Sequence, residues 1–284
     1  MKPAPFRYHA PATLDEAIGL LDTLEDARVL AGGQSLMPML NFRIVQPAHI
    51  VDINRVQGLS YIRREGEVLE VGAMTRQRDL EFSDVVAEAF PLLHEAVRLV
   101  GHRQTRNRGT LGGSLCQLDP SAELVTVAAA VDATIVVASK AGTREIPFAD
   151  FPLGLMSPAI EANELVVSVR FPLWKRGHGF AFEEFARRHG DFAVASAAVL
   201  LEMEHGRVER ASVVVGGLDS RPQRPKVGLH GRQSSTALFD EIAAACDGLE
   251  AMSDSHVDAG YRKRVARAMV RRALERARGR VATD

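Results

Sequence analysis

The chain has 284 residues, of which 46% are hydrophobic and 25% are charged, the composition of a folded globular protein. This length predicts one large domain or two modest ones. The 35 basic and 36 acidic residues nearly cancel, so the chain lacks the excess positive charge with which nucleic-acid-binding proteins attract phosphate backbones. We therefore expect no nucleic-acid partner.

The two cysteines, Cys116 and Cys246, exclude several kinds of site. An iron–sulfur cluster or a structural zinc site needs about four Cys or His ligands, and two scattered thiols suit a reducing compartment rather than a disulfide scaffold. The N-terminal segment has no apolar run typical of a secretory signal. The apolar stretches at 124–137 and 193–201 are respectively interrupted by Asp132 and too short to cross a bilayer. We expect a soluble cytoplasmic protein with no membrane span.

Residues 1–56 predict a small α/β unit. Thr13 and Glu16 form a capping box, and the apolar residues that follow recur at helical spacing up to residue 24. Residues 28–30 predict a short strand that leads directly into a pair of glycines. The unit ends with an apolar turn and a second strand, predicted at 36–40 and 50–53.

Residues 57–175 predict a second α/β unit. A strand at 68–71 is followed by a mostly helical stretch at 79–100 and by a basic loop at 102–108. The loop leads into a second pair of glycines. The rest of the unit is predicted as a helix or strand and two further strands, at 124–130, 134–137 and 165–171.

Residues 176–284 predict a third unit, in which a β-meander precedes two helices. The predicted strands are at 180–185, 193–202 and 208–215, and the helices at 237–249 and 256–278. The last helix is rich in arginine and has an apolar face. We interpret it as a solvated helix, with a docking surface for a partner as the alternative.

The sequence contains no recognisable catalytic constellation. It has no GxSxG, HExxH or Walker motif, and its histidines are scattered; His102 and His189 are interpreted as surface residues. No His, Asn or Asp pattern marks a partner for Cys116, which we interpret as a packing residue. We predict no catalytic residue and no metal ligand in this chain.

The informative feature is the two glycine pairs, one after the first strand and one after the basic loop. Glycine lets main-chain amides approach an anion closely, and successive amides in a turn form a concave nest for phosphate oxygens. Neither pair has the GxGxxG spacing of a Rossmann fold. Two such turns from two subdomains suit the diphosphate of a dinucleotide, and a side chain at Gly33 or Gly113 is expected to occupy phosphate space. The basic loop adds three candidates for offsetting phosphate charge: Arg103, Arg106 and Arg108.

Four motifs in register carry a resemblance to a known family: AGGQSL at 31–36, RNRGTLGGS at 106–114, DPSAE at 119–123 and RRHGDFA at 187–193. Over essentially its whole length, the chain resembles the FAD-binding medium subunit of the molybdenum hydroxylases, in the carbon monoxide dehydrogenase and xanthine dehydrogenase family. The resemblance implies an α+β fold. Subdomains 1–56 and 57–175 would clasp FAD in a fold of the vanillyl-alcohol-oxidase (PCMH) type. Residues 176–284 would form a C-terminal domain with a three-stranded sheet and a helical bundle.

The resemblance also assigns roles to particular residues. Residues 28–36 would form the first pyrophosphate loop and residues 110–114 the second. Glu123 would lie near the adenosine ribose, and the segment with Asp191 and Phe192 would approach the isoalloxazine ring. Phe192 would cover that ring where some relatives have tyrosine, so any contact of a phenol hydroxyl is lost. The full predicted set is Arg28, Val29, Leu30, Ala31, Gly32, Gly33, Gln34, Ser35, Leu36, Gly101, Thr110, Gly112, Gly113, Ser114, Glu123, Asp191 and Phe192. Residues 74–75 are expected to lie in a loop near the flavin.

The implied function is electron transfer. FAD would be held by this chain, the molybdenum cofactor by a large partner subunit, and two [2Fe–2S] clusters by a small one, in a dimer of heterotrimers. Electrons would pass from those clusters through FAD to an external acceptor. The low cysteine count agrees, because this chain cannot hold such clusters itself. Substrate specificity would belong to the large subunit, so the sequence names neither the substrate nor the acceptor.

Two alternatives remain open. One is a self-sufficient FAD-dependent oxidoreductase of the same fold, although the chain lacks a candidate base and a motif for covalent flavin attachment. The other is a non-catalytic assembly or regulatory protein that has lost its flavin, against which the intact glycine pairs argue.

Overall fold

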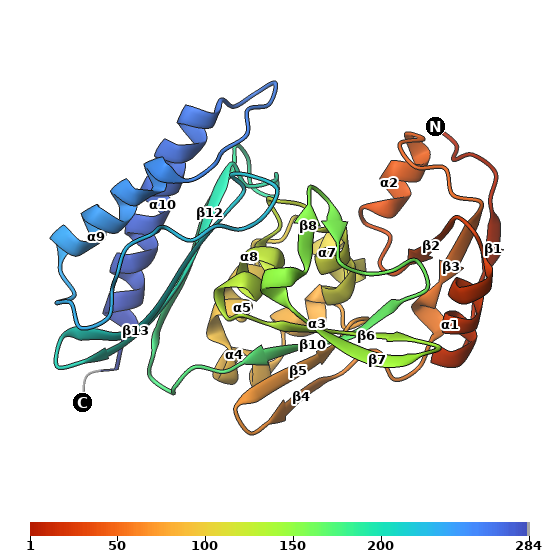
Figure 1. The fold of residues 1–284 in the computed structure, drawn as a ribbon, viewed down its shortest axis with the longest axis horizontal. Helices are drawn as coiled ribbons and strands as arrows, with labels where there is room; N and C mark the ends of the chain where they lie inside the picture. Colours follow the sequence, from red (N-terminus) through yellow and green to blue (C-terminus); the bar gives the residue numbers. More distant parts are fainter. Residues whose placement is uncertain (283–284) are drawn as a thin grey trace.

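The computed structural model describes residues 1–282, and its elements are shown in Figure 1. The strands are β1 (Arg7–His9), β2 (Ala27–Leu30), β3 (His49–Asp52), β4 (Ile62–Glu65), β5 (Val68–Gly72), β6 (Thr134–Ser139), β7 (Gly142–Pro147), β8 (Pro152–Gly154), β9 (Ser157–Pro158), β10 (Leu165–Pro172), β11 (Gly179–Phe185), β12 (Ala195–Glu204) and β13 (Arg207–Gly216). The α-helices are α1 (Leu14–Thr23), α2 (Leu36–Asn41), α3 (Gln77–Glu81), α4 (Asp84–Ala89), α5 (Pro91–Val97), α6 (Arg103–Arg108), α7 (Leu111–Gln117), α8 (Glu123–Ala130), α9 (Thr236–Ala244) and α10 (Ala259–Arg280). Three short 3₁₀ turns complete the fold: η1 (Ile53–Arg55), η2 (Phe148–Asp150) and η3 (Ala245–Gly248).

The N-terminal part is a parallel sheet with the strand order β1-β3-β2, and α1 packs against it. The predicted cap of α1 is present: the Thr13 hydroxyl accepts a hydrogen bond from the amide of Glu16 at 3.2 Å. The Glu16 carboxylate reaches back to the amide of Ala12 at 2.8 Å. Strand β1 was not predicted, because three residues with exposed side chains carry no alternating pattern.

The central part is an antiparallel sheet with the order β4-β5-β10-β6-β7. Its inner face packs on α5, α7 and α8 to form the largest hydrophobic core of the molecule. Residues 102–108 were predicted as a loop, but 103–108 form helix α6. The side chain of Arg106 is buried there because it pairs with Glu81 at 2.8 Å, so a polar sequence forms a packed helix.

The first apolar turn was also predicted incompletely: residues 36–41 are a short helix, α2. Pro38 is tolerated in its first turn, where the amide of a helix has no intrahelical partner.

The C-terminal part is the predicted meander, with the order β11-β12-β13. Helices α9 and α10 cover one face of this sheet, and α5 and α8 of the central part cover the other (Figure 1). Residues 195–201 of β12 are all buried because both faces are covered. This two-sided burial explains why the strand is an unbroken apolar run rather than an alternating one.

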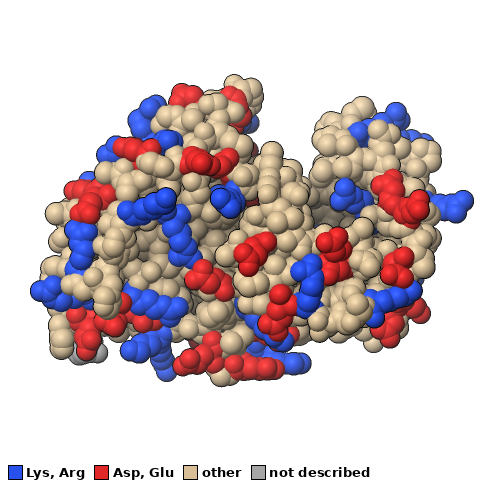
Figure 2. Space-filling model, viewed as in Figure 1, with Lys and Arg blue, Asp and Glu red and all other residues tan. Residues whose placement is uncertain are grey.

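Helix α10 buries an apolar face and carries arginines that pair with acids of the same chain. Five of its arginines form ion pairs: Arg262, Arg267, Arg271, Arg276 and Arg280. This favours a helix whose charges are used internally over a free basic surface. Figure 2 likewise shows both signs of charge interspersed on the visible face. Within residues 1–282, no helix has the length and the apolar character needed to cross a bilayer.

Candidate functional site

A cleft of about 800 Å³ lies between the parallel sheet and the central sheet. Figure 2 shows the molecule notched where the lobe that carries α2 stands apart from the rest. Cofactor sites typically measure ~300–1,000 Å³, so this cleft is large enough for a dinucleotide. Both glycine pairs line it, and residues 190–192 of the C-terminal part close one end.

The structure brings the predicted site residues together. All of them line the cleft except Leu30, which lies in strand β2 with its Cδ1 against the turn at Gly33. Residues from the two N-terminal lobes and from the C-terminal part therefore converge on one space, although they come from three separate segments, at 28–36, 101–123 and 190–192.

The two glycine pairs meet at the base of the cleft. A Cβ atom on Gly32 would lie 2.2 Å from the main-chain oxygen of Arg108 and 2.9 Å from the Cα of Gly109. A Cβ on Gly112 would lie 2.7 Å from the Cβ of Ala73. These two glycines are required because the protein backbone itself occupies the space of a side chain. The missing side chain of Gly32 thus lets the first loop pack against residues 108–109, and that of Gly112 lets the start of α7 pack against Ala73.

The first loop presents free main-chain amides. Within residues 1–282, the amides of Gly33, Gln34 and Ser35 donate to no protein acceptor. Gly33 adopts a φ of +75°, which glycine accepts without strain. Successive unpaired amides beside a positive-φ residue are the arrangement from which an anion nest is built.

The second glycine pair is not a turn, as was predicted, but the first turn of α7. The amides of Leu111 and Gly112 donate to the carbonyls of Thr75 and Ala73 at 3.0 and 2.9 Å. The Thr110 hydroxyl caps the helix by accepting from the amide of Gly113 at 3.1 Å. The two loops are therefore not equivalent: the first offers amides, whereas the second is fixed by its own hydrogen bonds.

A side chain at Gly33 or Gly113 would also meet atoms of the protein itself. A Cβ on Gly113 would lie 2.7 Å from the hydroxyl of Thr110, and one on Gly33 would lie 3.2 Å from Met37 and force a strained backbone. These clashes are with the protein.

Glu123 forms a buried wall of the cleft at the first residue of α8. Burial, together with the nearby carboxyl of Glu184, raises its pKa to about 8. Burial also raises the pKa of Asp119, which lines the same end. A carboxyl that keeps its proton near neutral pH offers one hydrogen-bond donor and one acceptor, which suits the hydroxyls of a sugar.

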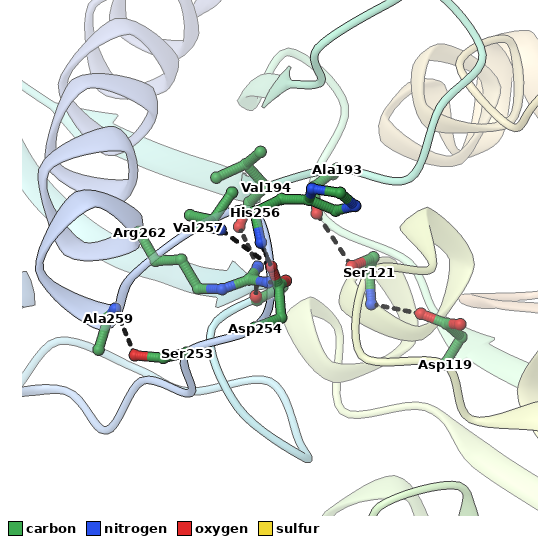
Figure 3. A network of polar contacts seen from close by, with 11 residues as sticks. Asp119, Ser121, Ala193, Val194, Ser253, Asp254, His256, Val257, Ala259 and Arg262 are labelled. Carbon is green, nitrogen blue, oxygen red and sulfur yellow. Dashed lines mark hydrogen bonds and ion pairs between the residues drawn. The ribbon is translucent and has the colours of Figure 1, made fainter.

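The Phe192 side chain is 72% exposed at the mouth of the cleft. Its loop is anchored just beyond this residue: the Ser121 hydroxyl donates to the carbonyl of Ala193 at 2.9 Å, and the Arg262 guanidinium donates to that of Val194 at 2.9 Å. Figure 3 shows these contacts joining the segment with Asp119 and Ser121 to helix α10. An apolar ring held at an open cleft has no partner in the described chain and is free to cover a bound ring.

Just before Phe192, the same loop packs on the central part. His102 and His189 are both exposed, as predicted, and their rings stack with the centroids 5.8 Å apart. Gly190, at φ +84°, lies against the His102 ring, where a Cβ would come within 2.3 Å. The contact helps to fix how this loop meets the cleft.

Several sequence-based candidates lie outside the cleft lining. Arg103, Arg106 and Arg108 do not line it, and Arg106 is committed to Glu81. Met74 lines the cleft as expected, whereas Thr75 is buried behind it. The thiol of Cys116 lines the cleft, but burial raises its pKa to about 12, so it is inert, as its interpretation as a packing residue requires.

Sequence reasoning missed the wall formed by residues 156–162 and 164–166. This irregular segment follows the β8–β9 hairpin and carries no motif, so nothing in the sequence marks it. Within residues 1–282, no three His, Cys, Asp or Glu side chains are grouped so that they could hold a metal ion.

Comparisons with known proteins agree with this site. Residues 4–174 match the family described as the FAD binding domain in molybdopterin dehydrogenase, and residues 180–277 match the CO dehydrogenase flavoprotein C-terminal domain. The chain is 40% identical to the 6-hydroxypseudooxynicotine dehydrogenase complex subunit alpha of Paenarthrobacter nicotinovorans, over 98% of this chain and 96% of that one. It is 37% identical to the carbon monoxide dehydrogenase medium chain of Hydrogenophaga pseudoflava, over 99% and 100%.

The fold agrees as well. A solved structure of carbon monoxide dehydrogenase from Hydrogenophaga pseudoflava, which lacks the Mo-pyranopterin moiety of the molybdenum cofactor, superimposes with a TM-score of 0.96 at 37% identity, covering 99% of this chain and 100% of that one. The chain belongs to the FAD-binding medium subunits of the molybdenum hydroxylases and is an oxidoreductase subunit.

Proposed function

We propose that this chain carries electrons, through bound FAD, from [2Fe–2S] clusters of a small partner subunit to an external acceptor. A large partner subunit holds the molybdenum cofactor and the substrate, and the complex is a cytoplasmic dimer of heterotrimers. The observation that carries the proposal is the cleft of about 800 Å³, which is lined by the first glycine loop with its free amides and by the second glycine pair.

The residues of the cleft fit FAD. Amides of Gly33, Gln34 and Ser35 face the space of a diphosphate, the Glu123 carboxyl suits ribose hydroxyls, and Phe192 suits the face of a flavin ring. Bound FAD accepts electrons singly or in pairs and releases them likewise. This chain's own residues bind and orient it, and none of them is assigned a proton-transfer step.

The low number of cysteines supports the partner assignment. Cys246 is buried and Cys116 is partly buried, and two thiols cannot supply the ligands of two [2Fe–2S] clusters, so the clusters that deliver electrons belong to another chain. The related chains are named as subunits of dehydrogenase complexes. We also propose that residues 1–56, 57–175 and 176–284 act as two FAD-binding subdomains and a C-terminal domain.

The test is to express the full chain alone and together with its neighbouring genes, and to record flavin absorption, metal content and the masses of co-purifying chains. We expect stoichiometric FAD, no iron or molybdenum in the isolated chain, and a complex with chains that contain both metals. A chain free of flavin would support the assembly or regulatory alternative. Substrate turnover by the isolated flavoprotein would support the self-sufficient oxidoreductase.

A further inference from the structure

A chain of polar side chains connects the two glycine loops behind the cleft. It consists of Asp52, Asn54 and Arg76 and is called the bracket below. Asn54 lies in the η1 turn after strand β3, and Arg76 lies immediately before helix α3. None of the three lines the cleft, so they do not belong to the surface that contacts a ligand.

Arg76 and Asn54 reach both loops. The Asn54 amide group donates from Nδ2 to the carbonyl of Ala31, in the first loop, at 2.8 Å. The Arg76 guanidinium donates from Nη2 to Asn54 Oδ1 at 2.7 Å and from Nη1 to the carbonyl of Arg108, the last residue of α6, just before the second loop. One side chain from each lobe thus joins Ala31 to Arg108 through a single continuous path.

The bracket meets the loops at their point of closest approach. The carbonyl of Arg108, which receives the Arg76 guanidinium, is the same atom that lies against Gly32. Arg76 is also paired with Thr110 in an isolated antiparallel bridge, closed by the bond from the amide of Gln77 to the carbonyl of Gly109 at 2.9 Å. The backbone and the side chain of Arg76 therefore both bind the segment that contains Arg108 and Thr110.

Asp52 fixes the orientation of Asn54. Its Oδ1 accepts from both the main-chain amide and Nδ2 of Asn54, at 2.9 and 2.5 Å. With Nδ2 facing two acceptors and Oδ1 facing a guanidinium donor, only one orientation of the amide satisfies all of them. Tyr8 donates to the other oxygen of Asp52 at 2.6 Å. A carboxylate in place of the Asn54 amide would face the Ala31 carbonyl and Asp52 with no proton to donate.

We propose that Arg76, held by Asn54 and Asp52, is a positioning residue that sets the mutual placement of the two glycine loops for binding the diphosphate of FAD. The proposal rests on the cleft being the FAD site. Because no bracket residue touches the cleft, it acts only through Ala31 and Arg108. A guanidinium is suited to this task because its planar fork donates in two directions at once, whereas a lysine cannot reach both acceptors.

The test uses the full chain, freed of FAD and titrated with it, in the variants Arg76→Met, Arg76→Lys and Asn54→Asp. We expect each to weaken FAD binding by roughly 10- to 100-fold, since hydrogen bonds to a charged group are lost. The affinity for ADP, which carries the diphosphate without the flavin, is expected to fall by the same factor. Arg78→Met is the matched control. Arg78 lies two positions further along the chain, and its guanidinium binds the Asn107 side chain rather than a glycine loop. The affinity of this variant for FAD is expected to be unchanged.

A double-mutant cycle separates positioning from simple stabilisation. If the bracket positions the loops, Arg76→Met adds little to the loss of FAD affinity already caused by Asn54→Ala. If it only stabilises the fold, the variants lower the melting temperature while the folded fraction binds FAD as tightly as the wild type, and the proposal fails. Should Arg76→Met not fold, Asn54→Ala gives the same comparison with the arginine kept. A wild-type chain that binds no FAD would overturn the proposed function instead.

Discussion

The cleft proposed to bind FAD and the C-terminal part of this chain are built from different kinds of contact. In the C-terminal part, the apolar face of α10 packs on the β11–β13 sheet, and arginines of α10 form ion pairs with acidic residues such as Asp247 and Glu183. At the cleft, two loops meet through glycine backbones and a few hydrogen bonds, with little apolar area between them. Apolar packing tolerates small changes of shape, whereas backbone contact at a glycine tolerates none.

This difference predicts where function and stability separate. Substitutions at the loop contact should abolish FAD binding and change the stability of the fold little. Substitutions in the C-terminal core should lower stability and leave the affinity of the folded chain for FAD unchanged.

The largest effect is expected at Gly32. In Gly32→Ala the new Cβ would lie 2.2 Å from the Arg108 carbonyl oxygen. The first loop must therefore move away from residues 108–109, which displaces its free amides. We expect no detectable flavin in the purified variant, measured as the ratio of absorption at the flavin band to protein. Gly19→Ala in α1 is the control, because nothing lies within 4 Å of its Cβ. A Gly32→Ala protein with full flavin content would contradict the loop contact.

The same comparison explains what could be predicted from sequence. The meander and α10 were predicted within a few residues, because apolar spacing determines amphipathic elements. Strands β1, β4 and β7 were missed, since their largely exposed residues show no period. The glycine pairs marked the cleft, but the helical nature of the second pair and the bracket were not foreseen. Both depend on contacts between residues far apart in the chain, such as Arg76 with Arg108.

The second effect concerns stability alone. Leu274 is fully buried on α10, and Leu274→Ala is expected to lower the free energy of unfolding by ~2–5 kcal/mol. The affinity of the folded variant for FAD should stay unchanged, because no atom of α10 lines the cleft. Urea titration and FAD titration below the unfolding transition measure the two quantities. Leu274→Met, which conserves volume, should lower the free energy of unfolding by less than ~1.5 kcal/mol. A parallel loss of FAD affinity in Leu274→Ala would show that the two regions are coupled.

A smaller effect is expected from pH. In the FAD-free chain the pKa of Glu123 is about 8, against an ordinary value of 4.5. The folded chain therefore keeps a proton that the unfolded chain releases, so its free energy of unfolding falls as pH rises from about 4.5 to about 8. Glu123→Gln should make that fall shallower, as measured by urea unfolding at a series of pH values.

The slope should not vanish in Glu123→Gln. Burial also raises the pKa of Glu184, to about 7, and that of Asp119, while the nearby Arg106 acts in the opposite direction on Glu123. Identical pH profiles of wild type and variant would show that Glu123 ionises normally.

The smallest effect is expected at Phe192, where the two regions meet. Its side chain is 72% exposed, so Phe192→Ala should change the free energy of unfolding by no more than ~0.5 kcal/mol. If the ring covers the flavin, stacking worth ~0.5–1.5 kcal/mol is lost and FAD binds roughly 2- to 10-fold more weakly. Leu153→Ala is the control, since Leu153 is as exposed, at 71%, but lies outside the cleft lining. The loop just beyond Phe192 is held by Ser121 and Arg262, so a weaker affinity in Phe192→Ala alone would show that a side chain of the C-terminal domain contacts the cofactor. Equal FAD affinities in both variants would leave the flavin uncovered by this loop.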